Sequence, residues 1–224
     1  MSHPAVTRAS QRHRRRGRPD GHDRDLRERL LDAAAVHFAR SGIAATSLRT
    51  IAAAVDVTPA MLHYYFGGKA QLVQALVEER LLPALVPVQA ALDHAGAGPL
   101  ALAEAFVRGM DDLVDQKPWL PALWVREVLC EGGGLRRLLL ERFMPRLPQA
   151  LARRFAAMPL GDRLDPHLLV VSLVGLTLFP AAGAPIWRQA FGLQSLHGQV
   201  LRDHTLALLA HGLAASSSMA GEAA

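Results

Sequence analysis

The stretch of sequence that decides the fold is TSLRTIAAAVDVTPAMLHYYFGGK, which covers residues 46–69. Its apolar residues recur at helical spacing in two short runs, separated by a turn of about three residues. Ala52 supplies a small side chain where two helices that cross steeply need one. This spacing is typical of a helix-turn-helix, whose second helix enters the DNA major groove with its first residues on base edges. Two ordinary short helices of a bundle give the same spacing, so that alternative stays open at this point.

The residues before this stretch predict one longer helix. Leu26, Leu30, Ala34 and Phe38 recur at every fourth position, which places them on one face of a helix. Gly42 follows as a natural C-terminal stop. Together with the two short helices, this helix completes an N-terminal three-helix DNA-binding domain.

The rest of the chain also predicts helices, and no run alternates between apolar and polar residues long enough to predict a strand. Segments rich in Gly and Pro separate helical stretches expected at about residues 99–115, 119–131, 135–157, 165–180 and 194–214. The expected fold class is therefore all-α, with a C-terminal helical bundle. The expected divisions are a flexible basic arm at 1–23, a helix-turn-helix domain at 24–70, the bundle at 71–214 and a disordered tail at 215–224.

Positive charge is concentrated in the first third of the chain. The whole chain has a formal net charge of +5, and residues 1–69 carry 12 Lys and Arg against 6 Asp and Glu. The remaining residues carry 13 against 14, so they are nearly neutral. This asymmetry indicates an end that binds a polyanion, attached to a neutral body.

The basic arm contains the run Arg14-Arg15-Arg16-Gly17-Arg18-Pro19. Its RGRP core is that of AT-hook peptides, in which arginines on either side of a glycine lie in a narrow A·T minor groove. Arg16 and Arg18 are therefore candidate DNA contacts. The alternative is a basic arm that attracts phosphates without sequence preference, and both predict an affinity that falls steeply with salt.

The ordered set of motifs closely resembles the tetracycline-repressor-like (TetR/AcrR) family of bacterial regulators. The resemblance rests on FARSG at the end of the first helix, then TSLRTIA, then VDVTPAMLHYYFGGK before an apolar helix, over roughly residues 25–80. It implies a homodimer with two N-terminal DNA-binding domains, and C-terminal bundles that hold an inducer and form the dimer.

Two positions depart from the family pattern. Asp56 stands in the turn where the family usually has Gly, and Asp adopts a left-handed backbone less readily. Leu62-His63-Tyr64-Tyr65-Phe66 replaces the usual L-Y-x-H-F, so histidine and tyrosine have exchanged places. The departures bear on DNA sequence preference and leave the class unchanged.

Residues on the first of the two short helices are expected at phosphates and at a base edge. Thr46 is the expected N-cap, with a hydroxyl exposed to a phosphate. Arg49 follows on the first turn, where an arginine can bind a guanine edge through two bonds. A solvated surface arginine is the alternative reading of Arg49.

The second short helix supplies the remaining candidates. Thr58, as N-cap, Ala60 and Met61 lead it, and such small or apolar groups contact thymine methyls and leave part of the readout to DNA shape. His63 and Tyr65 are expected to face the DNA backbone. Two further candidates are Tyr64, either a DNA contact or packing against the first helix, and Lys69, which matches the family's phosphate-binding lysine.

Two stretches of the bundle are candidates for the dimer interface, at 165–180 and 194–214. The first is apolar nearly all round and so needs burial on more than one side. The second has leucines and a valine on one side and Arg202, Asp203 and His204 on its polar side. A four-helix interface between two copies satisfies both, and a monomer with a thick core is the alternative.

An inducer pocket is expected between helices 99–131 and 135–180. Aromatic and flexible apolar side chains would line it, although each is alternatively plain core, and polar groups would orient a ligand. The expected lining residues are Phe106, Met110, Trp119, Trp124, Phe143 and Phe179, with Arg126 and Glu127 as the orienting groups.

Catalytic and metal-dependent functions have no support in the sequence. The single cysteine, Cys130, cannot form an intrachain disulfide, and we expect it to be a buried, unreactive thiol. The 10 histidines show no metal-ligand spacing on a common face, and no glycine-rich phosphate loop follows a strand. We therefore expect no metal, no cofactor and no enzymatic activity.

The uncharged segment from Pro166 to Trp187 has two interpretations. Its apolar run stops at Pro180, short of the ~20 residues that a membrane-spanning helix needs, and Gly183 and Pro185 follow. We expect a helix buried in a core or a subunit interface, with no membrane contact. Because no secretory signal is visible in the Arg-rich N-terminus, we expect a cytoplasmic protein.

The leading hypothesis is a ligand-responsive transcriptional repressor. It would bind a palindromic operator as a homodimer and be released by a small, largely apolar inducer. A small-molecule-binding helical protein with a vestigial helix-turn-helix is the second hypothesis. An all-α enzyme is the third, and it lacks a convergent acid–base or metal set in the sequence.

Overall fold

The computed structural model describes residues 21–160, 164–192 and 198–219, and these contain helices and turns but no strand. The arm residues Arg16 and Arg18 lie outside the described residues. The helices of the N-terminal part are α1 (Gly21–Ser41), α2 (Leu48–Ala53), α3 (Pro59–Phe66) and α4 (Lys69–Leu76). The π-helical turn η1 (Val77–Leu81), α5 (Leu82–Ala84) and α6 (Val86–Asp93) then carry the chain into the bundle.

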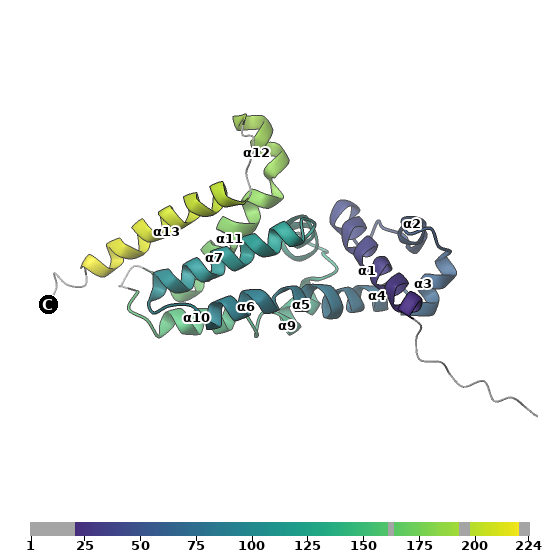
Figure 1. Cartoon of the computed structure of the whole chain (residues 1–224), viewed down its shortest axis with the longest axis horizontal. Coiled ribbons are helices and arrows are strands. Elements are labelled where there is room, and N and C mark those ends of the chain that lie inside the picture. Colours follow the sequence, from purple (N-terminus) through teal and green to yellow (C-terminus); the bar gives the residue numbers. More distant parts are fainter. Residues whose placement is uncertain (1–20, 161–163, 193–197, 220–224) are drawn as a thin grey trace, which may run out of the picture.

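The remaining helices form the bundle. They are α7 (Pro99–Gln116), α8 (Leu120–Trp124), the π-helical turn η2 (Val125–Leu129), α9 (Arg136–Arg142), α10 (Pro148–Ala156), α11 (Pro166–Ala182), α12 (Ala184–Phe191) and α13 (Gln199–Met219). The all-α fold class is therefore confirmed. Helices α2 and α3 lie at one end of the long axis, and the C-terminal end of α13 lies at the other (Figure 1).

The N-terminal helices form a small, closely packed unit. Helix α1 packs against α2 and α4, and α3 packs against both α2 and α4. Leu31 and Phe38 of α1, Ile51 and Ala52 of α2 and Leu62 of α3 are fully buried in the core that results. The predicted small residue at the crossing, Ala52, is in this core.

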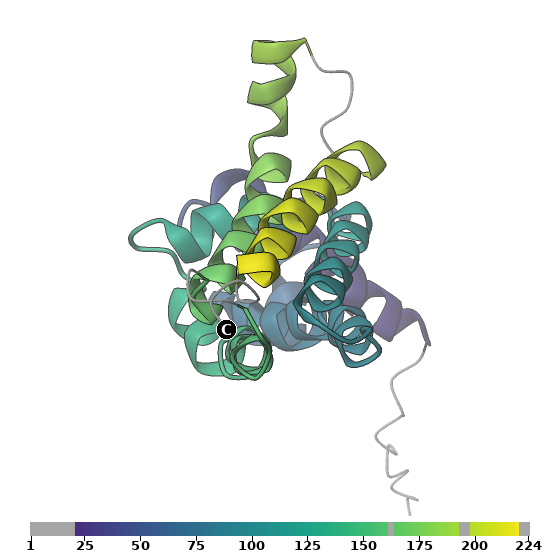
Figure 2. The same ribbon diagram turned by 90° about the vertical axis from the view of Figure 1, so that its left-hand side faces the viewer.

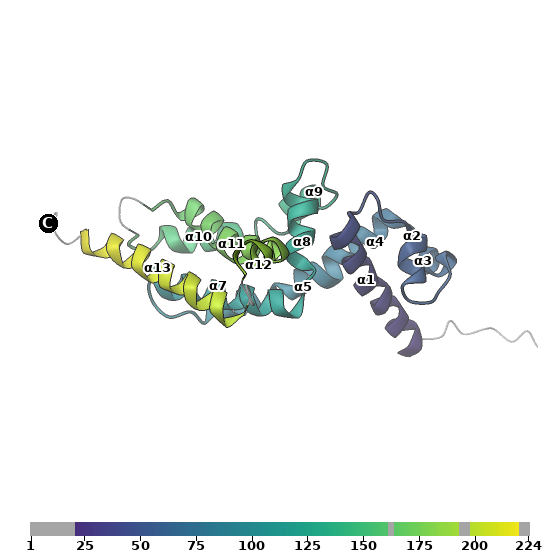
Figure 3. The ribbon, with the colours of Figure 1, turned by 90° about the horizontal axis from the view of Figure 1, so that it is seen from above.

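Helix α7 is the central helix of the bundle. It packs against α6, α11 and α13, and α11 also packs against α8 and α10. Seen from above, α8 lies beside the end of α1, where the bundle meets the N-terminal helices (Figure 3), and the two helices are in contact. The chain therefore passes from one part to the other along α4, and the two parts also touch through α8.

Three expectations for the helix boundaries are wrong. The expected helix 135–157 is two helices, because Pro145 interrupts it and Pro148 opens α10 as an N-terminal residue. Helix α11 continues through Pro180 to Ala182, because a proline in a last turn removes only one helical hydrogen bond. Helix α13 runs to Met219, beyond the expected end of this helix at 214.

Helix α12 was not predicted, and it stands away from the bundle (Figure 2). Among the described residues, no single helix is apolar and long enough to cross a membrane. The pair α11 and α12 passes such a test by length and composition, with a bend of 71° between them.

Candidate nucleic-acid interface and apolar cavity

Helix α2 begins one residue later than the sequence predicts. Ser47 is the N-cap, and its hydroxyl oxygen accepts a hydrogen bond from the Thr50 backbone N–H at 3.0 Å. Thr46 is buried, and its hydroxyl donates to the carbonyl of Gly42 at 2.7 Å and to that of His37 at 3.2 Å. The prediction of an exposed phosphate-binding hydroxyl at Thr46 is therefore wrong, because that hydroxyl satisfies carbonyls at the end of α1.

The turn between α2 and α3 uses a left-handed residue. Asp56 has φ +61°, the conformation that favours glycine and that the family usually fills with Gly. The Val57 N–H then bonds back to the carbonyl of Ala52 at 3.0 Å, which closes the end of α2. The turn is thus held at the cost of some backbone strain at Asp56.

Helix α3 buries one face and leaves the other open. Leu62 and Phe66 are buried, whereas Met61 and Tyr65 are partly buried. Tyr64 is 73% exposed, so of its two predicted roles the structure excludes packing against α1. The other residues that α3 and its N-cap expose are Thr58, Pro59, Ala60 and His63.

Two predicted cations flank this exposed face. Arg49 is exposed on the first turn of α2. Lys69 opens α4, and its Nζ donates to the carbonyl of Ala44 at 3.0 Å, so it also braces the loop between α1 and α2. An ammonium group has three donors, which leaves two for a phosphate.

A charged clamp holds α1 and α3 on the start of the bundle. The Arg27 guanidinium lies 4.8 Å above the Phe66 ring and binds both oxygens of Glu79 on η1, one at 2.6 Å. That bond lowers the pKa of the Glu79 carboxyl. Arg80 reaches back from η1 to Asp32 of α1 at 2.6 Å.

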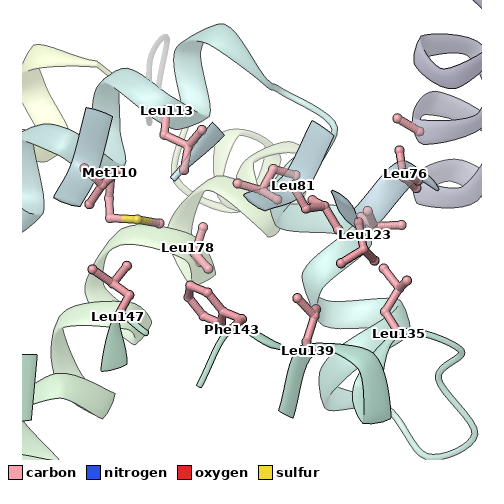
Figure 4. Packing of buried hydrophobic residues seen from close by; sticks show 14 of the residues in the cluster. Leu76, Leu81, Met110, Leu113, Leu123, Leu135, Leu139, Phe143, Leu147 and Leu178 are labelled. Atoms are coloured by element: carbon pink, nitrogen blue, oxygen red, sulfur yellow. The ribbon is translucent and has the colours of Figure 1, made fainter. Parts of the chain in front are cut away.

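The bundle contains a cavity of about 340 Å³. Figure 4 shows Met110, Leu113, Phe143 and Leu178 of its wall among the buried side chains around them. Trp124 and Phe143 meet in its wall edge to face, with ring centroids 5.9 Å apart. Every lining side chain is apolar; the lining residues are Leu81, Leu85, Phe106, Met110, Leu113, Leu120, Trp124, Leu129, Leu139, Phe143, Met144, Leu147, Pro148, Val170, Val171, Val174, Gly175 and Leu178.

The structure therefore places four of the predicted ligand residues, Phe106, Met110, Trp124 and Phe143, in one cavity wall. For two other residues, Phe179 and Glu127, the predicted position in the cavity wall is wrong. Phe179 is 61% exposed and packs on Trp187 of α12, so its ring does not line the cavity.

Glu127 is the second misplaced residue, because it points away from the cavity. It is 5% exposed and accepts hydrogen bonds from the backbone N–H groups of Ile43 and Gly134. Of the other predicted residues, Arg126 is exposed beside Gly42, and Trp119 packs on the core without lining the cavity.

Two further expectations need correction. Cys130 is exposed rather than buried, because it follows the last residue of η2 where the chain turns outward. Arg202 lies within the bundle, where its Nε is 3.0 Å from Asp111 of α7. The predicted polar side of α13 is thus divided: Asp203 and His204 are exposed, and Arg202 faces α7.

The residues that the sequence does not reveal are mainly aliphatic. Leu81, Leu113 and Leu178 line the cavity but follow the same helical spacing as ordinary core residues. Ser47 could have been recognised, since serine is as good an N-cap as threonine and lies next to it. Among the described residues, no group of three or more His, Cys, Asp or Glu side chains is placed to hold a metal.

Comparison with known proteins supports this reading. The sequence model for bacterial regulatory proteins of the tetR family matches residues 30–76. The HTH-type transcriptional repressor Rv3405c of Mycobacterium tuberculosis is 31% identical over 199 residues, which cover 84% of this chain and 88% of that protein.

Solved structures share the fold at lower identity. The ketosteroid transcriptional regulator KstR2 of Mycobacterium tuberculosis is 19% identical with a TM-score of 0.67, covering 84% of this chain and 94% of its own. AibR, solved with isovaleryl coenzyme A and operator DNA, is 19% identical with a TM-score of 0.57, covering 81% and 96%.

Proposed function

Because the chain belongs to the tetR family of bacterial regulatory proteins, we propose that it is a repressor that binds a palindromic operator as a homodimer and leaves it when an apolar effector fills the cavity. The chain is a DNA-binding transcriptional regulator and not an enzyme. Repression, the operator's symmetry, the homodimer and the effector's chemistry are the proposed parts.

The observation that carries the DNA-binding part is the open face of α2 and α3. Arg49, Thr58 and Tyr64 are exposed together there, with Lys69 beside the loop that precedes α2. Arg49 is suited to a guanine edge, and Tyr64 and Lys69 to phosphates. Since Ala60 offers no hydrogen bond, DNA shape supplies part of the specificity.

An exposed apolar surface supports the homodimer. One side of α11 is buried in the chain, and the adjoining side exposes Leu168, Val171 and Phe179, of which Val171 also borders the cavity. Ile186 and Phe191 of α12 extend this surface. A second copy related by a two-fold axis would bury the same surface on both chains, and two helix-turn-helix units so related require a palindromic operator.

The chemistry of the cavity wall supports an apolar effector. A dry, apolar cavity of about 150 Å³ holds a benzene ring, so 340 Å³ is enough for a two-ring compound or a chain of about ten carbons. A buried charge without a partner is strongly disfavoured in such a wall. AibR, with its ligand and operator DNA, is a solved example of this fold holding both.

Gel-shift titration against the promoter region of the chain's own gene tests the DNA part. Arg49→Ala is expected to weaken binding by about 5- to 150-fold, the loss of one guanine contact. Lys69→Ala should weaken binding and lower its salt dependence. The matched control is Arg137→Ala on α9, an exposed arginine of the bundle. Unchanged affinity in both variants would contradict the site assignment.

A fluorescent neutral probe tests the effector part. N-phenylnaphthylamine should bind the cavity and release operator DNA, and Leu178→Trp, which fills part of the cavity, should reduce its binding. Decanol should displace the probe, whereas decanoate at about pH 8, where the carboxyl is ionised, should displace it far less. Equal displacement by both would contradict an uncharged effector.

A further inference from the structure

The segment that separates the cavity from the DNA-binding end is η2 with the loop that follows it. Trp124, just before η2, and Leu129, its last residue, both line the cavity. Glu127 lies between them on the same turn and points to the other side, toward the loop between α1 and α2. One short element therefore carries cavity wall on one side and a contact to the helix-turn-helix on the other.

The Glu127 contact is specific in its geometry. Its Oε1 accepts the backbone N–H of Ile43 at 2.9 Å, and its Oε2 accepts that of Gly134 at 2.8 Å. The carboxylate is buried, so the loss of either bond leaves a polar group without a partner away from water. A β-carbon on Gly42 would lie only 3.2 Å from Oε1, so the loop approaches Glu127 closely.

The loop after η2 is fitted tightly to Glu127. A β-carbon on Gly133 would lie 2.3 Å from the Glu127 carbonyl oxygen, so that position requires glycine. The Arg136 guanidinium donates to the last two carbonyls of η2, those of Val128 and Leu129, and to that of Cys130 just after it, at 2.7–2.9 Å. A displacement of Leu129 therefore moves Glu127 and its loop together, because little slack separates them.

The loop between α1 and α2, which Glu127 contacts, is also held in place. Ile43 opens the loop that leads into α2, and two further contacts hold this loop: the Thr46 hydroxyl on the Gly42 carbonyl and Lys69 on the Ala44 carbonyl. A shift at Ile43 is therefore passed to the start of α2, which carries Arg49.

We propose that Glu127 is a positioning residue that couples occupancy of the cavity to the placement of α2 and thereby to operator affinity. This inference rests on the proposed effector function. An effector that displaces Trp124 and Leu129 moves η2, and Glu127 draws Ile43 with it. The competing route runs along the chain, because Leu81 and Leu85 also line the cavity and continue from α4.

A cavity-filling variant tests the coupling without an identified effector. Leu178→Trp serves as the occupied state, and operator affinity is measured for the native protein, L178W, E127A and the double variant. Because effector couplings usually change affinity by about 5- to 150-fold, we expect L178W to weaken operator binding about tenfold in the native background. In the E127A background the same substitution should weaken it less than about twofold.

Two further variants separate coupling from simple loss of structure. Glu127→Gln keeps the volume and one acceptor oxygen, so it should retain part of the coupling, and it replaces E127A if the alanine variant does not fold. Glu131→Ala removes an exposed carboxylate of the same segment and should behave as the native protein. A structural role alone would lower affinity by the same factor in the filled and unfilled proteins.

The outcomes distinguish the two proposals. Equal weakening by L178W with and without Glu127 would overturn the role of Glu127 and assign the coupling to α4. If L178W and N-phenylnaphthylamine both leave operator affinity unchanged in the native background, the effector function itself is overturned, and the coupling with it. A smaller effect of L178W in E127A and an intermediate one in E127Q would support the inference.

Discussion

The helix-turn-helix end and the cavity-bearing bundle are packed in different ways. At the DNA-binding end, Leu31, Phe38, Ile51 and Leu62 are fully buried, and bonds between near neighbours fix the helix ends. In the bundle, side chains from many helices surround about 340 Å³ of space. The close packing keeps the DNA-binding surface in one conformation, whereas the looser packing of the bundle leaves space for a ligand. Substitutions in each region are therefore expected to differ in their effect on stability.

The largest expected effect is on the tightly packed end. Phe38→Ala should lower the free energy of unfolding by about 3–5 kcal/mol, because it removes a fully buried ring from a closed core. Phe143→Ala should cost less, about 2 kcal/mol, because its ring already borders empty space and has fewer neighbours to lose. Urea titrations of the two variants measure both values. Equal losses would show that the cavity wall is packed as closely as the DNA-binding core.

The same contrast explains what the sequence could predict. The helix-turn-helix follows from capping residues and apolar spacing within one short stretch, so its position was correct to within one residue, Ser47 for Thr46. The all-α class followed from the spacing along the whole chain. These signals depend only on residues close together in the chain, so one sequence is enough to detect them.

The cavity could be predicted only in part, because it depends on how distant helices meet. Trp124 and Phe143 stood out as large aromatic residues, but the leucines beside them did not. Glu127 is predicted from the sequence as a polar group that orients a ligand, and the structure turns it to the other side. Its partner, Ile43, is 84 residues away, and no pattern in the sequence pairs them.

A smaller effect on stability is expected at Ser47, the N-cap of α2, which the sequence predicts one residue earlier, at Thr46. Ser47→Ala should lower the free energy of unfolding by about 1 kcal/mol, because it removes the bond that Thr50 N–H donates at the start of α2. Thr58→Ala is the matched control, since within the described residues the Thr58 hydroxyl makes no capping bond to α3. Thermal unfolding of both variants measures the two changes in stability. An equal loss of stability in Thr58→Ala and Ser47→Ala would contradict the assignment of Ser47 as the N-cap that bonds to α2.

A still smaller effect on stability, of opposite sign, is expected in the turn between α2 and α3. Asp56→Gly should raise the free energy of unfolding by about 0.5 kcal/mol, because glycine adopts φ +61° without the strain of a side chain, although it loses more entropy on folding. Ala54→Gly, just after α2 in a right-handed conformation, is the control and should destabilise. A loss of stability in Asp56→Gly would mean that the aspartate side chain stabilises the turn.

The smallest expected effect is a pH dependence confined to the bundle. Burial raises the pKa of the Asp111 carboxyl above its ordinary value of 3.8, although Arg202 of α13 lies 3.0 Å away and opposes the shift. An acid with a raised pKa binds its proton more tightly in the folded chain than in the unfolded one. Its contribution to stability is therefore complete below about pH 3.8 and is lost as the pH rises through the raised pKa.

Asp111→Asn should remove this slope, so that stability above about pH 4 falls less with rising pH than in the native protein. The control is Asp112→Asn, an exposed neighbour whose Oδ1 lies 3.6 Å from the same arginine. Melting temperatures across the acidic range, taken as differences from the native chain, measure the effect. Identical curves for Asp111→Asn and Asp112→Asn would show that burial at the contact of α7 with α13 does not govern this titration, and that the bundle is more open there than its packing implies.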